Sequence, residues 1–206
     1  CGMDADILQI VLRERFGSLA LDFVNTVVVT RSGPVDAFSG AGDVEAWMER
    51  AGTPAWSDLQ PRGVSERRVL HTEALQLRVS IDTLLGDTAA GRTVEGPTLH
   101  ALNRVLGWTR SSSRVVAGAR GPHTLEPTYE GLHPAASLAP IVEDAIRLVS
   151  SVDRSRLRRC RAEGCLRWFV DTSKGGRRTW CSMATCGNRA KAARYRARHE
   201  GDIDAA

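Results

Sequence analysis

The chain lacks long apolar runs, and Cys1 is its only cysteine before residue 160. The longest apolar candidate, residues 19–29, contains Asp22 and Asn25, so no window of about 18 uncharged apolar residues exists and no membrane-spanning helix is predicted. A signal peptide is not expected either, because the charged residues 13–15 interrupt the first apolar residues. These absences favour a cytoplasmic protein.

Motifs for common enzyme chemistry are also absent. The chain has neither a serine in a nucleophile-elbow sequence nor a glycine-rich loop that would hold phosphates. The five histidines do not have the spacing of a catalytic metal site: His71, His100, His123, His133 and His199. The sequence therefore predicts a protein that is not an enzyme.

Four cysteines lie close together as two pairs with identical spacing, Cys160-x4-Cys165 and Cys181-x4-Cys186. Each pair supplies two thiolates from one turn, and the segment between the pairs folds back to complete a tetrahedral Zn2+ shell. Two disulfides and four unconnected buried thiols are the alternatives; an intracellular location opposes the first and the repeated spacing opposes the second. Cys1 precedes the first methionine, is interpreted as a remnant of cloning, and is left out of the site.

Positive charge is concentrated near the C-terminus. Residues 154–199 contain fourteen basic and two acidic residues, a net charge of +12, whereas the rest of the chain carries −8. Clustered arginine neutralises phosphate well, so this segment favours a nucleic-acid partner. A solvated face in a chain that uses arginine in place of lysine is the alternative, since the whole chain has two lysines.

Helical periodicity dominates the first 150 residues. Apolar residues at helical spacing predict helices over residues 18–28, 43–51, 65–86, 97–106 and 134–151. Asp43 and Ser65 are the expected N-caps of two of them, and residues 31–42 are expected to form a loop. The long helix should bury Leu70, Ala74, Leu77, Ile81, Leu84 and Leu85, and the helix that follows should bury Leu99, Leu102, Val105 and Leu106.

Residues 113–129 contain alternating and β-branched residues around Arg120-Gly121-Pro122, which predicts a β-hairpin. The fold class is therefore mainly α (α+β), with a helical N-terminal domain and one small hairpin. We expect a domain boundary where the composition turns basic, giving residues 1–152 as a helical domain and residues 153–206 as a zinc module.

Between the cysteine pairs, Leu166, Trp168 and Val170 alternate with Arg167 and Phe169 as in a strand, and Lys174-Gly175-Gly176 predicts a turn back towards Trp180. This outline fits a small treble-clef-like or ribbon-like zinc module. Trp168, Phe169 and Trp180 are expected to pack around the metal site rather than stack on bases.

The module ends in a predicted basic helix. Ala190, Ala193 and Ala197 form a narrow face of small residues flanked by cations, which suits close approach to duplex DNA. The alternative is that the alanines pack on the hairpin while the arginines are only solvated. The candidate DNA contacts in this segment and the preceding turn are Arg177, Arg178, Arg189, Lys191, Arg194, Arg196 and Arg198.

These residues closely resemble the CGNR zinc finger, a bacterial family named for a tetrapeptide that occurs here as residues 186–189. The resemblance covers about residues 155–199 and implies that Cys160, Cys165, Cys181 and Cys186 bind zinc and that the module binds DNA. Residues 16–26, FGSLALDFVNT, resemble the start of the ABATE domain, which precedes that finger in predicted stress-induced transcription regulators. The resemblance implies a DNA-binding module attached to a larger domain with a candidate role in sensing a small molecule.

A transcription regulator that binds duplex DNA as a homodimer, in association with the nucleoid, is the leading hypothesis, because one short helix contacts too few base pairs for useful specificity. An RNA-binding or ribosome-associated zinc protein is the alternative, and it requires Trp168, Phe169 and Tyr195 to be exposed for stacking.

Asp22 and Asn25 are the candidate effector contacts, because polar side chains one turn apart in an apolar helix need partners when buried. The alternative is that they brace neighbouring backbone. Trp47, Trp56 and Trp108 could line an apolar cavity, although ordinary core packing is the favoured interpretation for each.

Overall fold

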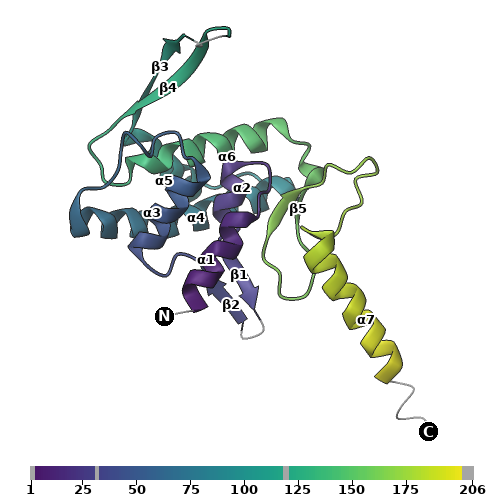
Figure 1. Ribbon diagram of the computed structural model, residues 1–206. Coiled ribbons are helices and arrows are strands. Elements are labelled where there is room, and N and C mark those ends of the chain that lie inside the picture. The colour runs from purple at the N-terminus through teal and green to yellow at the C-terminus, as the bar shows by residue number, and fades with distance from the viewer. Residues whose placement is uncertain (1–2, 31–32, 118–120, 201–206) are drawn as a thin grey trace.

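The computed structural model describes residues 3–30, 33–117 and 121–200 (Figure 1). The larger part is a set of helices around α4 (Gly63–Ala90), which is 28 residues long. The helices packed on α4 are α2 (Leu19–Val24), α3 (Ala41–Ala51), α5 (Gly96–Gly107) and α6 (Ala139–Ser151), and α1 (Met3–Arg13) packs on α3.

The core lies along the inner face of α4. All six residues that the 3.6-residue period assigned to that face are buried, from Leu70 to Leu85. Phe23, Phe38 and Trp47 meet beside them, with ring centroids 5.3 to 6.0 Å apart. Aromatic rings in tilted and edge-to-face contact bury a large apolar area, so this cluster anchors α2 and α3 against the bundle.

The strands form three separate antiparallel pairs: β1 (Val27–Thr30) with β2 (Gly33–Asp36), β3 (Arg110–Val116) with β4 (Thr124–Glu130), and β5 (Leu157–Arg159) with β6 (Trp168–Val170). The β3–β4 ribbon is the hairpin predicted from the sequence; Arg120 of its expected turn lies outside the described residues. This ribbon and α7 (Asn188–Glu200) project from opposite ends of the molecule (Figure 1).

The β1–β2 hairpin corrects two predictions. The helix expected over residues 18–28 ends at Val24, and β2 occupies part of the expected loop over residues 31–42. Asn25 is the C-cap of α2, and the β-branched run that follows it prefers an extended backbone. The predicted start of this helix is confirmed: Ser18 is the N-cap of α2, and its hydroxyl accepts a hydrogen bond from the backbone N–H of Leu21.

Two further helices begin before the predicted residue. α4 starts at Gly63 rather than Ser65 and continues past Gly86 to Ala90. A glycine inside a helix costs only about 1 kcal/mol, and Gly91, at φ 67°, supplies the left-handed C-cap instead. α3 starts at Ala41; Asp43 lies within its first turn and accepts the backbone N–H of Gly40 at 2.8 Å.

Two smaller predictions were also wrong. Pro134 does not open a helix: a 3-10 turn, η1 (Ala136–Leu138), precedes α6, and Pro140 takes the early helical position that proline tolerates. Leu99, expected in the core, is 44% exposed on α5. The fold class is nevertheless confirmed, since a helical part with small hairpins is followed by a four-cysteine module that ends in a basic helix.

Gly131, at the base of the β3–β4 ribbon, provides a test of this packing. A Cβ atom on Gly131 would lie 2.5 Å from the carbonyl oxygen of Trp108 and 2.9 Å from Cβ of Ala136. We expect Gly131→Ala to lower the free energy of unfolding by about 1–3 kcal/mol, measured by urea denaturation. Gly107→Ala is the control: nothing lies within 4 Å of its Cβ and the residue is helical, so the same measurement should show no loss. Equal stability of the two variants would contradict the packing at Gly131.

Candidate metal centre and basic helix

The four cysteines come from two turns of a small module. A 3-10 turn, η2 (Arg154–Arg156), leads from α6 into β5, and the connection from β5 to β6 carries Cys160 and Cys165. Cys186 lies in a single π-helical turn, η3 (Met183–Gly187), which runs directly into α7. The strand expected after Cys165 is present as β6, but its partner is β5 rather than the segment that follows Gly176.

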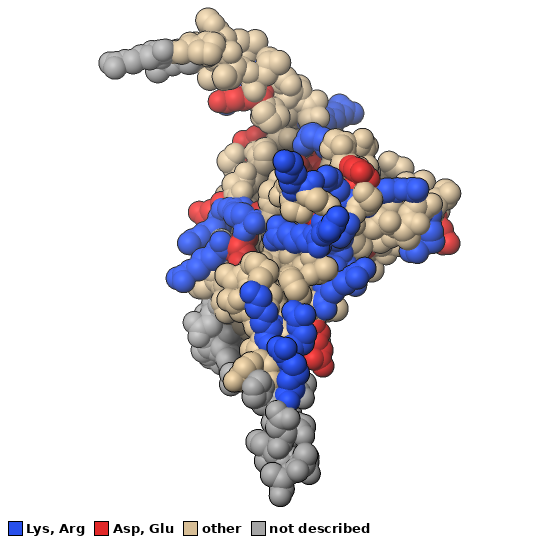
Figure 2. Space-filling model, turned by 90° about the vertical axis from the view of Figure 1, so that its right-hand side faces the viewer, with Lys and Arg blue, Asp and Glu red and all other residues tan. Residues whose placement is uncertain are grey.

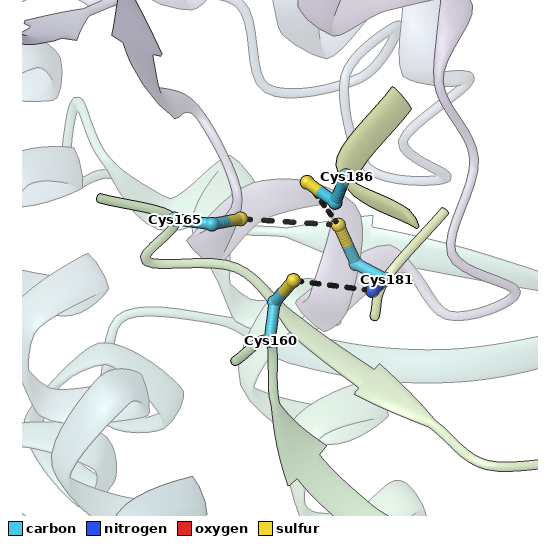
Figure 3. A group of neighbouring side chains, drawn as sticks. All are labelled: Cys160, Cys165, Cys181 and Cys186. Atoms are coloured by element: carbon cyan, nitrogen blue, oxygen red, sulfur yellow. Dashed lines mark hydrogen bonds between the residues drawn. The ribbon is translucent and has the colours of Figure 1, made fainter. Parts of the chain in front are cut away.

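The four sulfur atoms point toward one another (Figure 3). All four Sγ atoms lie within 4.8 Å of one another, and three of the four cysteines are buried. Sγ of Cys181 lies 3.9 Å from Sγ of Cys165 and 3.6 Å from Sγ of Cys186. The cysteines form no disulfide, so the disulfide alternative does not hold for them.

These distances fit a tetrahedral metal site. Four thiolates at about 2.3 Å from one Zn2+ ion would have their sulfur atoms about 3.8 Å apart. The distances from Sγ of Cys181 to Sγ of Cys165 and to Sγ of Cys186 lie on either side of that value. The backbone N–H of Cys181 also donates to Sγ of Cys160 at 3.3 Å, as expected around an electron-rich sulfur. The donor set therefore fits a structural metal ion whose four coordination positions are all occupied by cysteine.

The clustered thiols influence one another's acidity. A hydrogen bond with Cys181 is the main reason that the pKa of Cys165 is lowered to about 5. Burial, and then the charge of Cys165, raise the pKa of Cys186 to about 11, and the pKa of Cys181 is raised as well. Thiolates in this small volume repel one another, which opposes the loss of their protons. A divalent cation that replaces the protons offsets the negative charge, so metal binding favours the thiolate form.

Asp171 organises the loop between the two cysteine pairs. Its buried carboxylate accepts the Ser173 hydroxyl at 2.6 Å, the Ser173 N–H at 2.9 Å and the Arg178 N–H at 2.8 Å. The Ser173 hydroxyl is the largest influence on the Asp171 carboxyl, whose pKa is lowered to about 2. The loop that delivers Cys181 is therefore held by a carboxylate that stays ionised.

β6 is buried on both faces, which corrects the predicted alternation. Trp168 and Phe169 are both buried, and Arg167 is only 8% exposed, whereas Leu166 is exposed. Arg167 pairs with Glu14, and its guanidinium lies 5.7 Å from the centroid of the Phe16 ring. Phe169 packs on the cysteine cluster as expected, but Trp168 belongs to the core of the larger part.

Asn25 joins that larger part to β6. Its side-chain Nδ2 donates to the carbonyl of Trp168 at 2.8 Å, and its Oδ1 accepts the N–H of Trp168 at 2.7 Å. A side-chain amide here pairs with both polar groups of one buried residue, as a neighbouring strand would. The partners are 143 residues apart, so periodicity and spacing gave no sign of this contact.

A second contact between the parts is centred on Asp82 of α4. The Trp168 indole Nε1 donates to its carboxylate at 2.8 Å, and Arg159 pairs with the same carboxylate. Arg159 also lies over the Trp168 ring, 4.8 Å from its centroid. The four-cysteine module is thus docked on the helical part through polar groups from both sides.

Asp22 braces backbone too. Its Oδ1 accepts the N–H of Phe16 at 2.6 Å and its Oδ2 accepts Nη1 of Arg15 at 3.2 Å. Burial is the largest effect on this carboxyl and raises its pKa above the ordinary value. Asp22 and Asn25 therefore both use their polar atoms on protein groups, which matches the bracing alternative for the two residues.

The proposed basic surface is exposed along α7. Figure 2 shows lysine and arginine side chains along this helix and over the adjoining face of the molecule, with few acidic side chains among them. The exposed candidates are Arg177, Arg189, Lys191, Arg194, Arg196 and Arg198. Ala190 is half-buried and Ala193 is exposed, while the side chain of Ala197 lies outside the described set.

Three candidate DNA contacts are engaged within the protein, among them Arg194, whose guanidinium lies 5.9 Å from the centroid of the Trp180 ring. Arg178 donates to the carbonyls of Trp180 and Cys181, and its guanidinium lies 4.9 Å from the centroid of the Phe169 ring. Arg189 contacts the carbonyl of Glu163 at 3.3 Å while its side chain stays exposed. Arg178 is therefore a structural residue of the metal-binding loop.

Ring exposure separates the two nucleic-acid hypotheses. Trp168 is 5% exposed and Phe169 is 2% exposed, whereas Tyr195 on α7 is 58% exposed. Two of the three rings that the RNA hypothesis needs are thus unavailable for stacking. The other tryptophans follow the packing interpretation: Trp47 and Trp56 are buried in the core, and Trp108 stacks on His133 with ring centroids 3.7 Å apart.

Comparison with known families identifies two successive parts of the chain. Residues 156–199 match the model of the CGNR zinc finger. Residues 17–152, about two thirds of the chain, match the ABATE model, which is described as "Putative stress-induced transcription regulator". The chain therefore belongs to the ABATE family and carries a CGNR zinc finger after that domain. A search of curated proteins finds no match.

The matched families are regulator and zinc-finger families rather than enzyme families. Within the described parts of the chain, no helix has the length and apolar character needed to cross a bilayer.

Proposed function

We propose that the protein is a transcription regulator that binds duplex DNA through α7 and the adjoining finger surface, with Zn2+ held by Cys160, Cys165, Cys181 and Cys186. Residues 1–152 are the regulatory domain and residues 153–206 the DNA-binding module in this proposal, which places the protein with the chromosome in the cytoplasm. The support comes from the two family matches and the geometry of the cysteine cluster.

The observation that carries the proposal is a row of exposed cations on a helix whose first residue directly follows the metal-binding turn. A metal ion would fix the start of α7 relative to the finger, while the helix itself extends away from the body (Figure 1) and carries exposed basic side chains (Figure 2). Arg194 and Arg198 lie one turn apart, so both can reach phosphates along one edge of the helix. RNA binding remains the alternative partner class and is compared directly in the experiment.

Replacing Arg194 and Arg198 together with alanine is expected to weaken DNA binding at least about tenfold at physiological salt. The loss of two phosphate contacts should also reduce the slope of log affinity against log salt by about two, because each contact releases about one counterion. Fluorescence anisotropy with a duplex from the protein's own promoter region, a random duplex and a matched RNA measures both effects. Zinc content should be unchanged, since the described hydrogen bonds of both side chains go to backbone carbonyls of α7 and not to cysteine sulfur.

The matched control removes two exposed arginines from the helical part, Arg13 and Arg68. This variant has the same net charge as the finger variant, so a general charge effect would weaken both equally. Full DNA affinity in the Arg194→Ala, Arg198→Ala protein, or a preference for the RNA, would contradict the proposal that α7 binds duplex DNA.

We further propose that the regulator acts as a homodimer. One short recognition helix contacts a few base pairs, and two-fold symmetry doubles the site that is read. Sedimentation of the protein alone and on DNA tests this: one protomer per duplex at saturation would contradict the dimer.

A further inference from the structure

A cavity of about 500 Å3 lies between the ABATE domain and the zinc finger. The domain contributes the segment leading into α2, residues 15–18, and the end of α6. The finger contributes β6 and the loop that carries Arg178 and Cys181. The volume falls in the range of about 300–1,000 Å3 that is typical of small-molecule sites, and sites of this kind favour domain interfaces.

The lining holds two guanidinium groups and no carboxylate: Arg15 and Arg178 are basic, and neither Asp nor Glu is among the lining residues. Its other ionisable group is the thiol of Cys181, whose charge as a thiolate would be offset in part by the metal ion that it binds. Nε and Nη2 of Arg178 donate to backbone carbonyls, whereas Nη1 forms no hydrogen bond among the described residues. Arg15 contacts Asp22 and the carbonyl of Arg50, and its side chain is half exposed. The Asp22 carboxylate offsets part of the charge of Arg15, whereas no carboxylate neighbours the guanidinium of Arg178 in the described contacts.

The rest of the lining is largely apolar. Leu21 and Leu148 come from the domain, and Phe169 and Val170 come from the finger. A ligand that satisfies this lining has an anionic group for the free Arg178 donor and an apolar body for the side chains around it. A bare phosphate would leave the apolar part unused, and a neutral molecule would leave the guanidinium unpaired.

We propose that this cavity binds a small organic anion with an apolar body, such as an aromatic carboxylate. The ligand would contact both parts of the chain, so it would favour the docked arrangement of the finger and thereby change DNA affinity; this regulatory step rests on the proposed function. A second cavity of about 280 Å3, beside Asn25, is less suited to an anion because its arginines, Arg78 and Arg159, are already paired with Asp36 and Asp82.

Calorimetric titration of the zinc-loaded, full-length protein tests the site without DNA. The probes are four acids, 2-naphthoate, indole-3-acetate, salicylate and 4-methylpentanoate, each beside its neutral amide, up to about 10 mM, where a Kd of about 1 mM still gives near saturation. We expect at least one acid to bind one site per chain, at least about tenfold more tightly than its amide. Equal binding of every acid and its amide, or no binding by any acid, would overturn the proposal.

Three variants assign such binding to the cavity. Arg15→Gln removes a lining cation and should weaken the acid about three- to tenfold, while Arg50→Gln removes an exposed cation outside the lining and should leave the affinity unchanged. Ser151→Trp places a large ring in the lining at an exposed position and should abolish binding. Unchanged affinity in Ser151→Trp would place the acid elsewhere and overturn the site.

The DNA arm of the experiment is separate. If the acid binds in the cavity but the protein binds no duplex, the anion site stands and the proposed function fails. If the protein binds duplex but no acid, the proposed function stands and the anion site fails. If both bind, anisotropy titrations with and without the acid should differ by at least about threefold in affinity; identical affinities would overturn the regulatory step.

Discussion

Replacing Asn25 with alanine is expected to lower the free energy of unfolding by about 2–5 kcal/mol, because it leaves two buried backbone groups without partners. The Asn25 amide is 3% exposed and contacts both the N–H and the carbonyl of Trp168. Each buried polar group that loses its partner costs about 1–3 kcal/mol, whereas the removed side chain itself contributes little apolar area. Denaturant unfolding of the zinc-loaded protein measures the change.

The site of the damage can be measured as well. Backbone hydrogen exchange should show loss of protection at the N–H of Trp168, with protection of the inner face of α4 retained. Asn103→Ala is the matched control, because Asn103 is exposed on α5 and the substitution favours the helix. If Asn25→Ala is as stable as Asn103→Ala, the contact with Trp168 does not hold the finger on the domain.

This contact shows that the finger is not tethered by a flexible linker alone. Leu157 and Trp168 from the finger are part of the core of the helical domain. Asp82 and Glu14 from that domain pair with Arg159 and Arg167 of the finger. A change on either side of the junction therefore reaches the other through packed and hydrogen-bonded groups, which is the physical requirement for coupling between sites.

Local features of the sequence predicted the four-cysteine cluster and most helices well. The repeated x4 spacing indicated the cysteine cluster because ligand spacing is a local property of a turn. The apolar period of α4 indicated its buried face for the same reason, and the charge division indicated the exposed cations of α7. Helix ends were less predictable, since Gly86 continues a helix and Gly91 ends one, and only the backbone conformation distinguishes them.

Long-range contacts could not be predicted from these patterns. Arg167 looked like an outward-facing residue of a strand, and it is buried because Glu14 and Phe16 lie beside it. For Arg167 the partners lie in a segment whose position depends on the whole fold. Arg178, a candidate DNA contact, donates to two carbonyls of its own loop, which the residue pattern did not predict even though these partners are close in the sequence.

Replacing Cys186 with serine is expected to have a still larger effect: loss of bound zinc and unfolding of the finger. A closed four-thiolate site supplies much of the folding energy of a small module, about 10–16 kcal/mol for zinc binding to finger peptides. Cys186 also leads into α7, so losing it as a ligand releases the helix that carries the exposed arginines. DNA affinity should therefore fall to the level of nonspecific binding.

The same substitution should destabilise the helical domain, and this distinguishes a docked finger from an independent one. When β6 unfolds, Trp168 leaves the domain core and the carboxylate of Asp82 loses its partners there. The thermal midpoint of the domain should fall by about 5 °C or more, since about 1 kcal/mol corresponds to roughly 2–4 °C in a chain of this size. Elemental analysis of the bound metal, with thermal unfolding followed by circular dichroism, measures both changes, and Cys1→Ser controls for the loss of a thiol. A Cys186→Ser protein that lost its zinc but kept the wild-type midpoint of the domain would show that the finger folds independently; one that kept a full equivalent of zinc would contradict the four-cysteine site itself.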